Sequence, residues 1–180
     1  MLKEGENMLA VVAIRWSDGS FLEDQDHWWM AGIHRSVYLR STGKTFLEDM
    51  FPRTELNQGL DSGSLEVEAR VNFAGKAEAG WKVGIQLIDP EENWVFPSMP
   101  VEELPLAEQT RINLGHLIRI YKNVKKPKLW SSETPYLYTV LICLFDPSGK
   151  EVEWTSCKIG FRRIEIKNRE MLINGMPVLI

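Results

Sequence analysis

Residues Leu65–Phe73 alternate strictly between apolar and polar side chains, and this pattern constrains the fold more than any other in the chain. Its apolar positions are Leu65, Val67, Ala69, Val71 and Phe73. A period of two is typical of a β-strand with one buried face. That face must pack against a second layer. The neighbouring segments predict strands and no helix, so we expect the second layer to be another sheet.

Other segments between residues 45 and 165 show comparable patterns. Further strands are predicted at Lys82–Leu87, Arg111–Val124, Pro135–Phe145 and Glu151–Ile159. Phe46–Leu60 fits either a strand or a loop, and Asp146–Gly149 has the composition of a hairpin turn. About six or seven strands separated by turns predict an all-β, immunoglobulin-like antiparallel β-sandwich.

The two ends of the chain have patterns of their own. Met8–Trp16 is an apolar, β-branched run that predicts a strand, and Ile33–Leu39 alternates as its only plausible partner. Phe21–Met30, between them, predicts an ordered loop. Near the other end, Asn174–Gly175 between apolar flanks is a strong hairpin signal. Both ends look like pieces of larger domains.

Composition excludes several classes of function. The chain has 21 Lys and Arg against 25 Asp and Glu, a net charge of −4, so it lacks the basic surface that nucleic acid requires. No apolar run has the length of a membrane helix. The first residues do not resemble a signal peptide, which favours a cytoplasmic location.

Two cysteines, Cys143 and Cys157, lie in apolar strand-like runs. Buried free thiols are the simpler interpretation, and a single bridge between neighbouring strands remains open. Neither the cysteines nor the histidines have zinc-site spacing, and His34 and His116 occur in strand-like contexts typical of structural residues. Trp130 and Trp154 are predicted to be core or corner residues.

The segment from Ser17 to Trp29 concentrates chemistry-bearing side chains. They are Asp18, Glu23, Asp24, Asp26, His27, Trp28 and Trp29. Such a segment can be a solvated acidic loop, or it can bind a cation or sugar, since oxygen ligands suit hard cations. No motif fixes a pair of carboxylates for glycoside hydrolysis, and the sequence has no other recognised catalytic signature.

The run Arg15–Trp28, continued by Met30–Arg35, resembles the conserved stretch of glycoside hydrolase family 2 β-galactosidases. Pro127–Ser131 with Pro135–Tyr138 is similar to the family's sandwich domain, and Gly160–Arg162 with Leu172–Ile180 to its lead into the catalytic barrel. The resemblance implies three parts: residues 1–42 from the end of a jelly-roll sugar-binding domain, 43–163 as an immunoglobulin-like sandwich, and 164–180 as the entry to a (β/α)8 barrel.

By the same resemblance, Asp26 is the aspartate that contacts the galactosyl group and ligates sodium. The catalytic glutamates and the magnesium ligands would belong to the barrel, which this chain lacks. Three positions depart from the family pattern: Trp29, Ala31 and His34 stand where arginine, serine and an aromatic residue are usual.

The resulting hypothesis is a non-catalytic part of a β-galactosidase, inactive alone, with no cofactor of its own. The complete enzyme would bind a β-galactoside and could form a homo-oligomer. Two alternatives stay open: an independent carbohydrate-binding module that uses Trp28 and Trp29, and a ligand-free interaction sandwich that pairs through exposed strands.

Overall fold

The structure is a computed structural model that describes residues 3–22, 32–106 and 116–178. The chain divides into two compact units, Met1–Ser41 and Thr42–Ile180.

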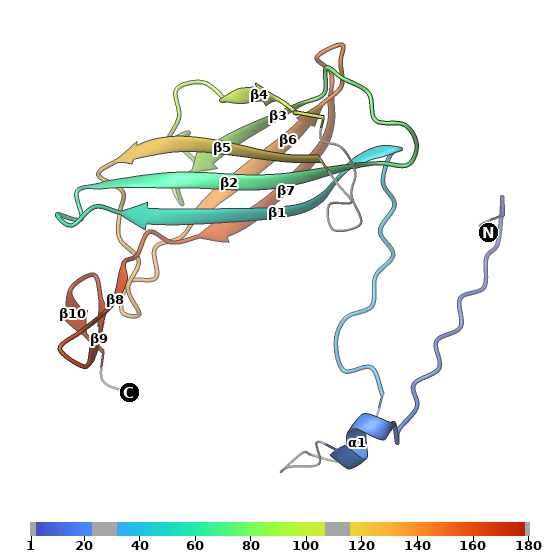
Figure 1. Cartoon of the computed structure of the whole chain (residues 1–180), viewed down its shortest axis with the longest axis horizontal. Helices are drawn as coiled ribbons and strands as arrows, with labels where there is room; N and C mark the ends of the chain where they lie inside the picture. The colour runs from blue at the N-terminus through green and yellow to red at the C-terminus, as the bar shows by residue number, and fades with distance from the viewer. Residues whose placement is uncertain (1–2, 23–31, 107–115, 179–180) are drawn as a thin grey trace. The chain divides into compact units, whose positions relative to one another are not determined.

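Two antiparallel sheets form the body of the second unit (Figure 1). The first sheet has the order β1-β2-β5 and the second has the order β4-β3-β6-β7. The strands of the first sheet are β1 (Thr45–Leu56), β2 (Ser62–Phe73) and β5 (His116–Lys125). Those of the second are β3 (Lys82–Ile88), β4 (Val101–Glu103), β6 (Tyr138–Phe145) and β7 (Glu151–Ile159). The predicted antiparallel sandwich is therefore confirmed.

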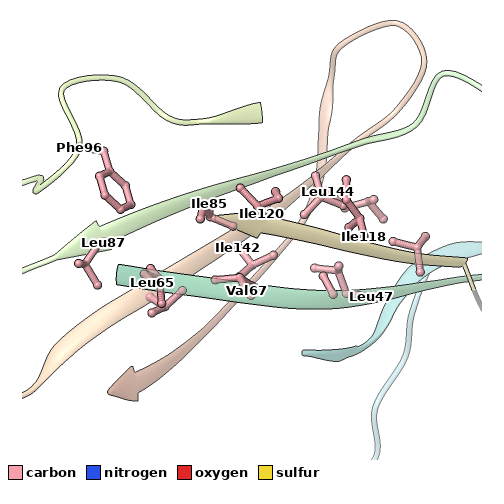
Figure 2. Packing of buried hydrophobic residues seen from close by; sticks show 14 of the residues in the cluster. Leu47, Leu65, Val67, Ile85, Leu87, Phe96, Ile118, Ile120, Ile142 and Leu144 are labelled. Carbon is pink, nitrogen blue, oxygen red and sulfur yellow. The ribbon is translucent and has the colours of Figure 1, made fainter. Parts of the chain in front are cut away.

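The core fills the space between the sheets, where side chains from both inner faces meet (Figure 2). All five apolar positions of the alternating run in β2 are buried, as predicted. They face a matching set from the second sheet, which includes Val83, Ile85, Leu87, Val140, Ile142 and Leu144. Burial of each such side chain contributes about 1.5 to 3 kcal/mol. Hydrophobic burial along β2, β3 and β6 therefore dominates the stability of the sandwich.

The ambiguous segment Phe46–Leu60 becomes β1, a strand with a bulge between Leu47 and Asp49. The bulge shifts the register by one residue, which moves the inward positions from the odd Leu47 to the even Met50. This break in the alternation explains why the sequence fitted both a strand and a loop. At the bulge, the backbone N–H of Leu47 donates to Oε2 of Glu153 on β7 at 2.8 Å.

The outer face of β3 is covered by the segment between residues 94 and 100. Gln86 lies on that face and is fully buried. Its Nε2 donates to the carbonyl of Phe96 at 3.1 Å, and its Oε1 accepts from the N–H groups of Phe96 at 3.2 Å and Leu87 at 2.9 Å. The side-chain amide of Gln86 thus provides hydrogen bonds for the backbone of Phe96, which has no main-chain partner on β3.

A third, small sheet follows the sandwich, with the order β10-β9-β8 (Figure 1). Its strands are β8 (Ile164–Lys167), β9 (Glu170–Ile173) and β10 (Met176–Pro177). Two-residue turns connect them, at Asn168–Arg169 and at the predicted Asn174–Gly175. All four turn residues have positive φ, as a type I′ turn requires. The hairpin signal at Asn174–Gly175 is confirmed.

Both cysteines are free thiols, so the simpler of the two interpretations holds. Cys143 on β6 lies opposite Trp154, and Cys157 on β7 lies opposite Val140. Residues directly opposite share a face, and Val140 and Cys143 are three residues apart, so the thiols point to opposite faces of the sheet. A bridge between them is excluded by this register. Burial raises the pKa of Cys143 to about 12 and also raises that of Cys157.

In the first unit, the described residues form one short helix, α1 (Asp18–Leu22), and no strand. The strands expected at Met8–Trp16 and Ile33–Leu39 are therefore wrong in this structure. Val12 is 84% exposed and Leu39 is 87% exposed. A pair of strands alone cannot bury its apolar faces, and the described part of this unit supplies no further strand for them.

Candidate functional site

The acidic and aromatic segment predicted to carry a site is described only as far as Leu22. Asp18 lies in the first turn of α1. Ser17 begins this turn, since its carbonyl accepts the N–H of Ser20 at 2.9 Å and the two hydroxyls lie 3.3 Å apart. Asp26, the residue expected to contact substrate and sodium, lies outside the described residues, together with Glu23, Asp24, His27, Trp28 and Trp29.

The histidines and tryptophans predicted as structural have different surroundings. His116 is buried on β5 and makes an edge-to-face contact with Phe73, with ring centroids 5.3 Å apart, which fits a structural residue. His34 lies in the first unit, outside any strand. Trp154, predicted to be a core or corner residue, is 45% exposed on the edge strand β7, which excludes the core alternative. Its Nε1 donates to Oε2 of Glu151 at 3.2 Å, and it lies opposite Cys143 on β6.

Trp130, predicted to be a core or corner residue, is half-buried and packs directly on Gly160. A Cβ atom added to Gly160 would lie 2.8 Å from the Cβ of Trp130, so only glycine allows this approach. The guanidinium of Arg162 lies over the indole ring, 4.5 Å from its centroid. Sequence reasoning missed this pair, because a contact between residues 130 and 162 follows from the strand arrangement and not from any local motif.

A cleft of about 550 Å³ opens beside Trp130. Its lining consists of Pro52, Thr54, Trp130, Leu137, Lys158, Ile159, Gly160, Arg162 and Ile164. The lining holds two cationic side chains and no carboxylate, and the hydroxyl of Thr54 donates to the carbonyl of Gly160 at 3.0 Å. Among the described residues that line it, the cleft therefore has no acid and no paired nucleophile and base. Nucleophilic catalysis and glycoside hydrolysis need such groups, and the described lining does not supply them.

A second polar group joins Glu91, Lys128 and Tyr136. Nζ of Lys128 lies 3.0 Å from Oε1 of Glu91 and 4.7 Å from the centroid of the Tyr136 ring, and the Tyr136 hydroxyl donates to Oε2 of Glu91 at 2.7 Å. The hydrogen bonds from Tyr136 and Lys128 lower the pKa of Glu91. The bond to Glu91 raises the pKa of Lys128. All charges in this group are compensated, so it ties two loops together and leaves no reactive base.

Residues 3–22, 32–106 and 116–178 show neither a metal site nor a membrane-spanning helix. Within these ranges no three His, Cys, Asp or Glu side chains are grouped as metal ligands. The same ranges contain no helix that is long and apolar enough to cross a membrane. The described residues therefore provide a scaffold with a cleft, and the groups predicted to touch a ligand belong to the segment around Asp26.

Comparison with known families matches both parts of the chain. Residues 45–162 match the family described as glycosyl hydrolases family 2. Residues 1–43 match the sugar binding domain of glycosyl hydrolases family 2.

Curated relatives extend the match over nearly the whole chain. A β-galactosidase of Vibrio cholerae is 37% identical over 187 residues, which cover 99% of this chain and 17% of that protein. The β-galactosidase of Alteromonas mediterranea is 38% identical, covering 100% of this chain and 17% of the relative. That of Priestia megaterium is 37% identical with the same 17% share. The chain thus spans about a sixth of the length of the curated relatives that it matches.

Solved structures agree on the fold. A β-glycosidase from Bacteroides vulgatus superposes with a TM-score of 0.64 at 21% identity, over 82% of this chain and 17% of that one. The β-glucuronidase of Parabacteroides merdae gives a TM-score of 0.61 at 24% identity, over 76% of this chain and 16% of that one. At these identities the likeness establishes the sandwich fold. From the family match over residues 45–162, the chain belongs to glycosyl hydrolases family 2.

Proposed function

We propose that this chain is part of a β-galactosidase that hydrolyses terminal β-D-galactosides. One observation carries the proposal: β-galactosidases are 37% to 38% identical to this chain across 99% to 100% of its length. The match includes the segment around Asp26 that sequence reasoning singled out.

In this proposal the chain supplies structure and one ligand-contacting residue. The cleft beside Trp130 lacks carboxylates, which agrees with a part of the enzyme that does not carry out the chemistry. Retaining hydrolysis needs two carboxyl groups about 5 to 5.5 Å apart, one as nucleophile and one as acid and base. The family resemblance assigns these glutamates and the magnesium ligands to the barrel. The 180-residue chain alone is therefore expected to be inactive.

Asp26 is the residue of this chain that we propose touches the substrate. A carboxylate can accept hydrogen bonds from sugar hydroxyls and can also ligate a cation, so one residue suits both roles. The sodium ion would supply a fixed positive charge next to the galactosyl group. Hydrogen bonds to a charged partner contribute about 1.5 to 3 kcal/mol, so loss of the carboxylate should cost roughly 10- to 150-fold in kcat/KM.

A chimera tests the proposal. The homologous region of the Vibrio cholerae β-galactosidase is replaced by this chain, and hydrolysis of an aryl β-galactoside is measured. We expect an active chimera, an Asp26→Asn variant with the loss given above, and a weaker response of that variant to sodium. Asp24→Asn, two residues away in the same acidic run, is the matched control and should keep most of the activity.

Two outcomes would contradict the proposal. The first is turnover by the pure 180-residue chain, which would show that catalysis does not need the barrel. The second is a folded but inactive chimera together with saturable galactoside binding by the chain alone in calorimetry. That pair of results would favour an independent carbohydrate-binding module.

A further inference from the structure

The third sheet, β8 to β10, is joined to the sandwich with little apolar packing. Ile166 is 84% exposed, Met176 is 71% exposed and Ile164 is 51% exposed. Ile164 also lines the 550 Å³ cleft together with residues of the sandwich, so a hollow and not a packed interface lies beside the start of this sheet. The three exposed side chains therefore contribute little packing between the third sheet and the sandwich, while Met171, Leu172 and Ile173 on β9 are half-buried.

One side chain bridges this joint. Oδ1 of Asn174 accepts the N–H of Arg163 at 2.9 Å, and Nδ2 of Asn174 donates to the carbonyl of Trp130 at 2.9 Å. The N–H of Asn174 donates to the carbonyl of Arg163 at 2.8 Å. Arg163, which directly precedes β8, also donates from Nη2 to Oε1 of Glu165 at 2.8 Å. Among the described residues, the bond from Asn174 to Trp130 is therefore the hydrogen bond that reaches from the third sheet back to the sandwich. The bond to Trp130 joins residues 44 positions apart in sequence.

The far end of this bridge is attached to the core. The N–H of Trp130 donates to the carbonyl of Phe161 at 2.9 Å, and the Trp130 ring lies against Gly160. Phe161 is fully buried, with its ring centroid 5.2 Å from that of Tyr138. The Trp130 carbonyl that Asn174 contacts is therefore a fixed point of the sandwich.

We propose that Asn174 is a clasp that orients the third sheet relative to the sandwich. An amide is required because the position must donate to one carbonyl and accept from one N–H at once. Asparagine also tolerates the φ of 50° that the turn imposes. The clasp is a property of residues 130, 163 and 174 and does not depend on the proposed enzymatic function.

Asn168 provides a matched control. It opens the other two-residue turn of the same sheet with a φ of 52°, close to the 50° of Asn174. Its side chain has no hydrogen bond to any described residue. Asn168→Gly and Asn174→Gly therefore make the same change in the same type of turn, and they differ in whether the clasp is lost. Asn174→Asp keeps an acceptor for Arg163 and loses the donor to Trp130.

Nuclear magnetic resonance of the 180-residue chain reads out both halves of the clasp. Amide exchange at Arg163 reports the Oδ1 bond, and residual dipolar couplings report whether the third sheet and the sandwich share one alignment. Loss of one hydrogen bond changes an equilibrium constant by a factor of roughly 2 to 12. Asn174→Gly should therefore speed amide exchange at Arg163 by about tenfold. It should also reduce the residual dipolar couplings of the third sheet relative to those of the sandwich. Asn174→Asp should lower the alignment while Arg163 stays protected. Asn168→Gly should change neither quantity.

The proposal is overturned if Asn174→Gly and Asn168→Gly have the same effect on both readouts. If Asn174→Gly unfolds the third sheet altogether, the Asn174→Asp variant decides. A third sheet that stays formed and loses its common alignment with the sandwich supports the clasp, whereas unchanged couplings in that variant refute it.

Discussion

Gln86→Leu is the substitution that most directly tests how the second sheet is completed. Gln86 is fully buried, and its amide makes three hydrogen bonds, to the carbonyl and N–H of Phe96 and to the N–H of Leu87. Leucine has nearly the same volume but cannot form any of them. The three backbone groups would remain inside the protein without their partner.

The expected loss follows from these groups. An unsatisfied buried backbone group costs about 1 to 3 kcal/mol, and partial relaxation of the covering segment keeps each near the lower value, for a total of about 3 to 5 kcal/mol. The larger apolar surface of leucine offsets about 1 kcal/mol. We therefore expect the free energy of unfolding to fall by about 2 to 4 kcal/mol.

Urea and thermal unfolding, followed by circular dichroism, measure this loss. At about 3 °C per kcal/mol, the melting temperature should fall by roughly 6 to 12 °C, while the urea m-value stays unchanged. Gln58→Leu is the control, because Gln58 is exposed in the turn after β1 and the same change there should stay within about 0.5 kcal/mol. Equal stabilities of the two variants would refute the reasoning on Gln86.

Three further perturbations have expected outcomes. Gly160→Ala forces a Cβ against Trp130 and should lower the unfolding free energy by about 1 to 3 kcal/mol in urea titrations. Cys143, whose pKa burial raises to about 12, should react with iodoacetamide at pH 8 roughly 1000-fold more slowly in the folded chain than in the unfolded one. Because its folded pKa exceeds the ordinary value of 9.0, its contribution to stability is complete below pH 9 and is lost as the pH rises toward 12. Arg119→Ala breaks a 2.9 Å ion pair with Glu68, but the arginine side chain is 61% exposed, so chemical denaturation should detect less than about 1 kcal/mol, with the difference shrinking in salt.

Much of the sandwich was predictable because its strands alternate. The period of two along β2 predicts which side chains are buried without knowledge of the opposing sheet. In the structure all of these side chains are buried. The turns at Asp146–Gly149 and Asn174–Gly175 were predictable for a similar reason, since their residues suit the backbone conformations that such turns require. The Asn168–Arg169 turn escaped prediction because arginine at positive φ has no comparable local signal.

The candidate site was predictable only in part. The composition around Asp26 and the resemblance it carries indicated where a ligand would bind, and that role remains a prediction. The cleft beside Trp130 was not foreseen, because its lining includes residues as far apart in sequence as Pro52 and Ile164. The stacking of Arg162 on Trp130 was not foreseen either, because no local motif links the two positions.

The sequence by itself determined the class of fold and the inward faces of the strands, because periodicity and turn chemistry act between neighbouring residues. Only the tertiary structure decided that Gln86 is buried, that Asn174 reaches Trp130 and that the two thiols cannot pair. Each of these depends on which segment lies opposite in space. These contacts between distant segments form when the two sheets pack together, so no local sequence pattern predicts them.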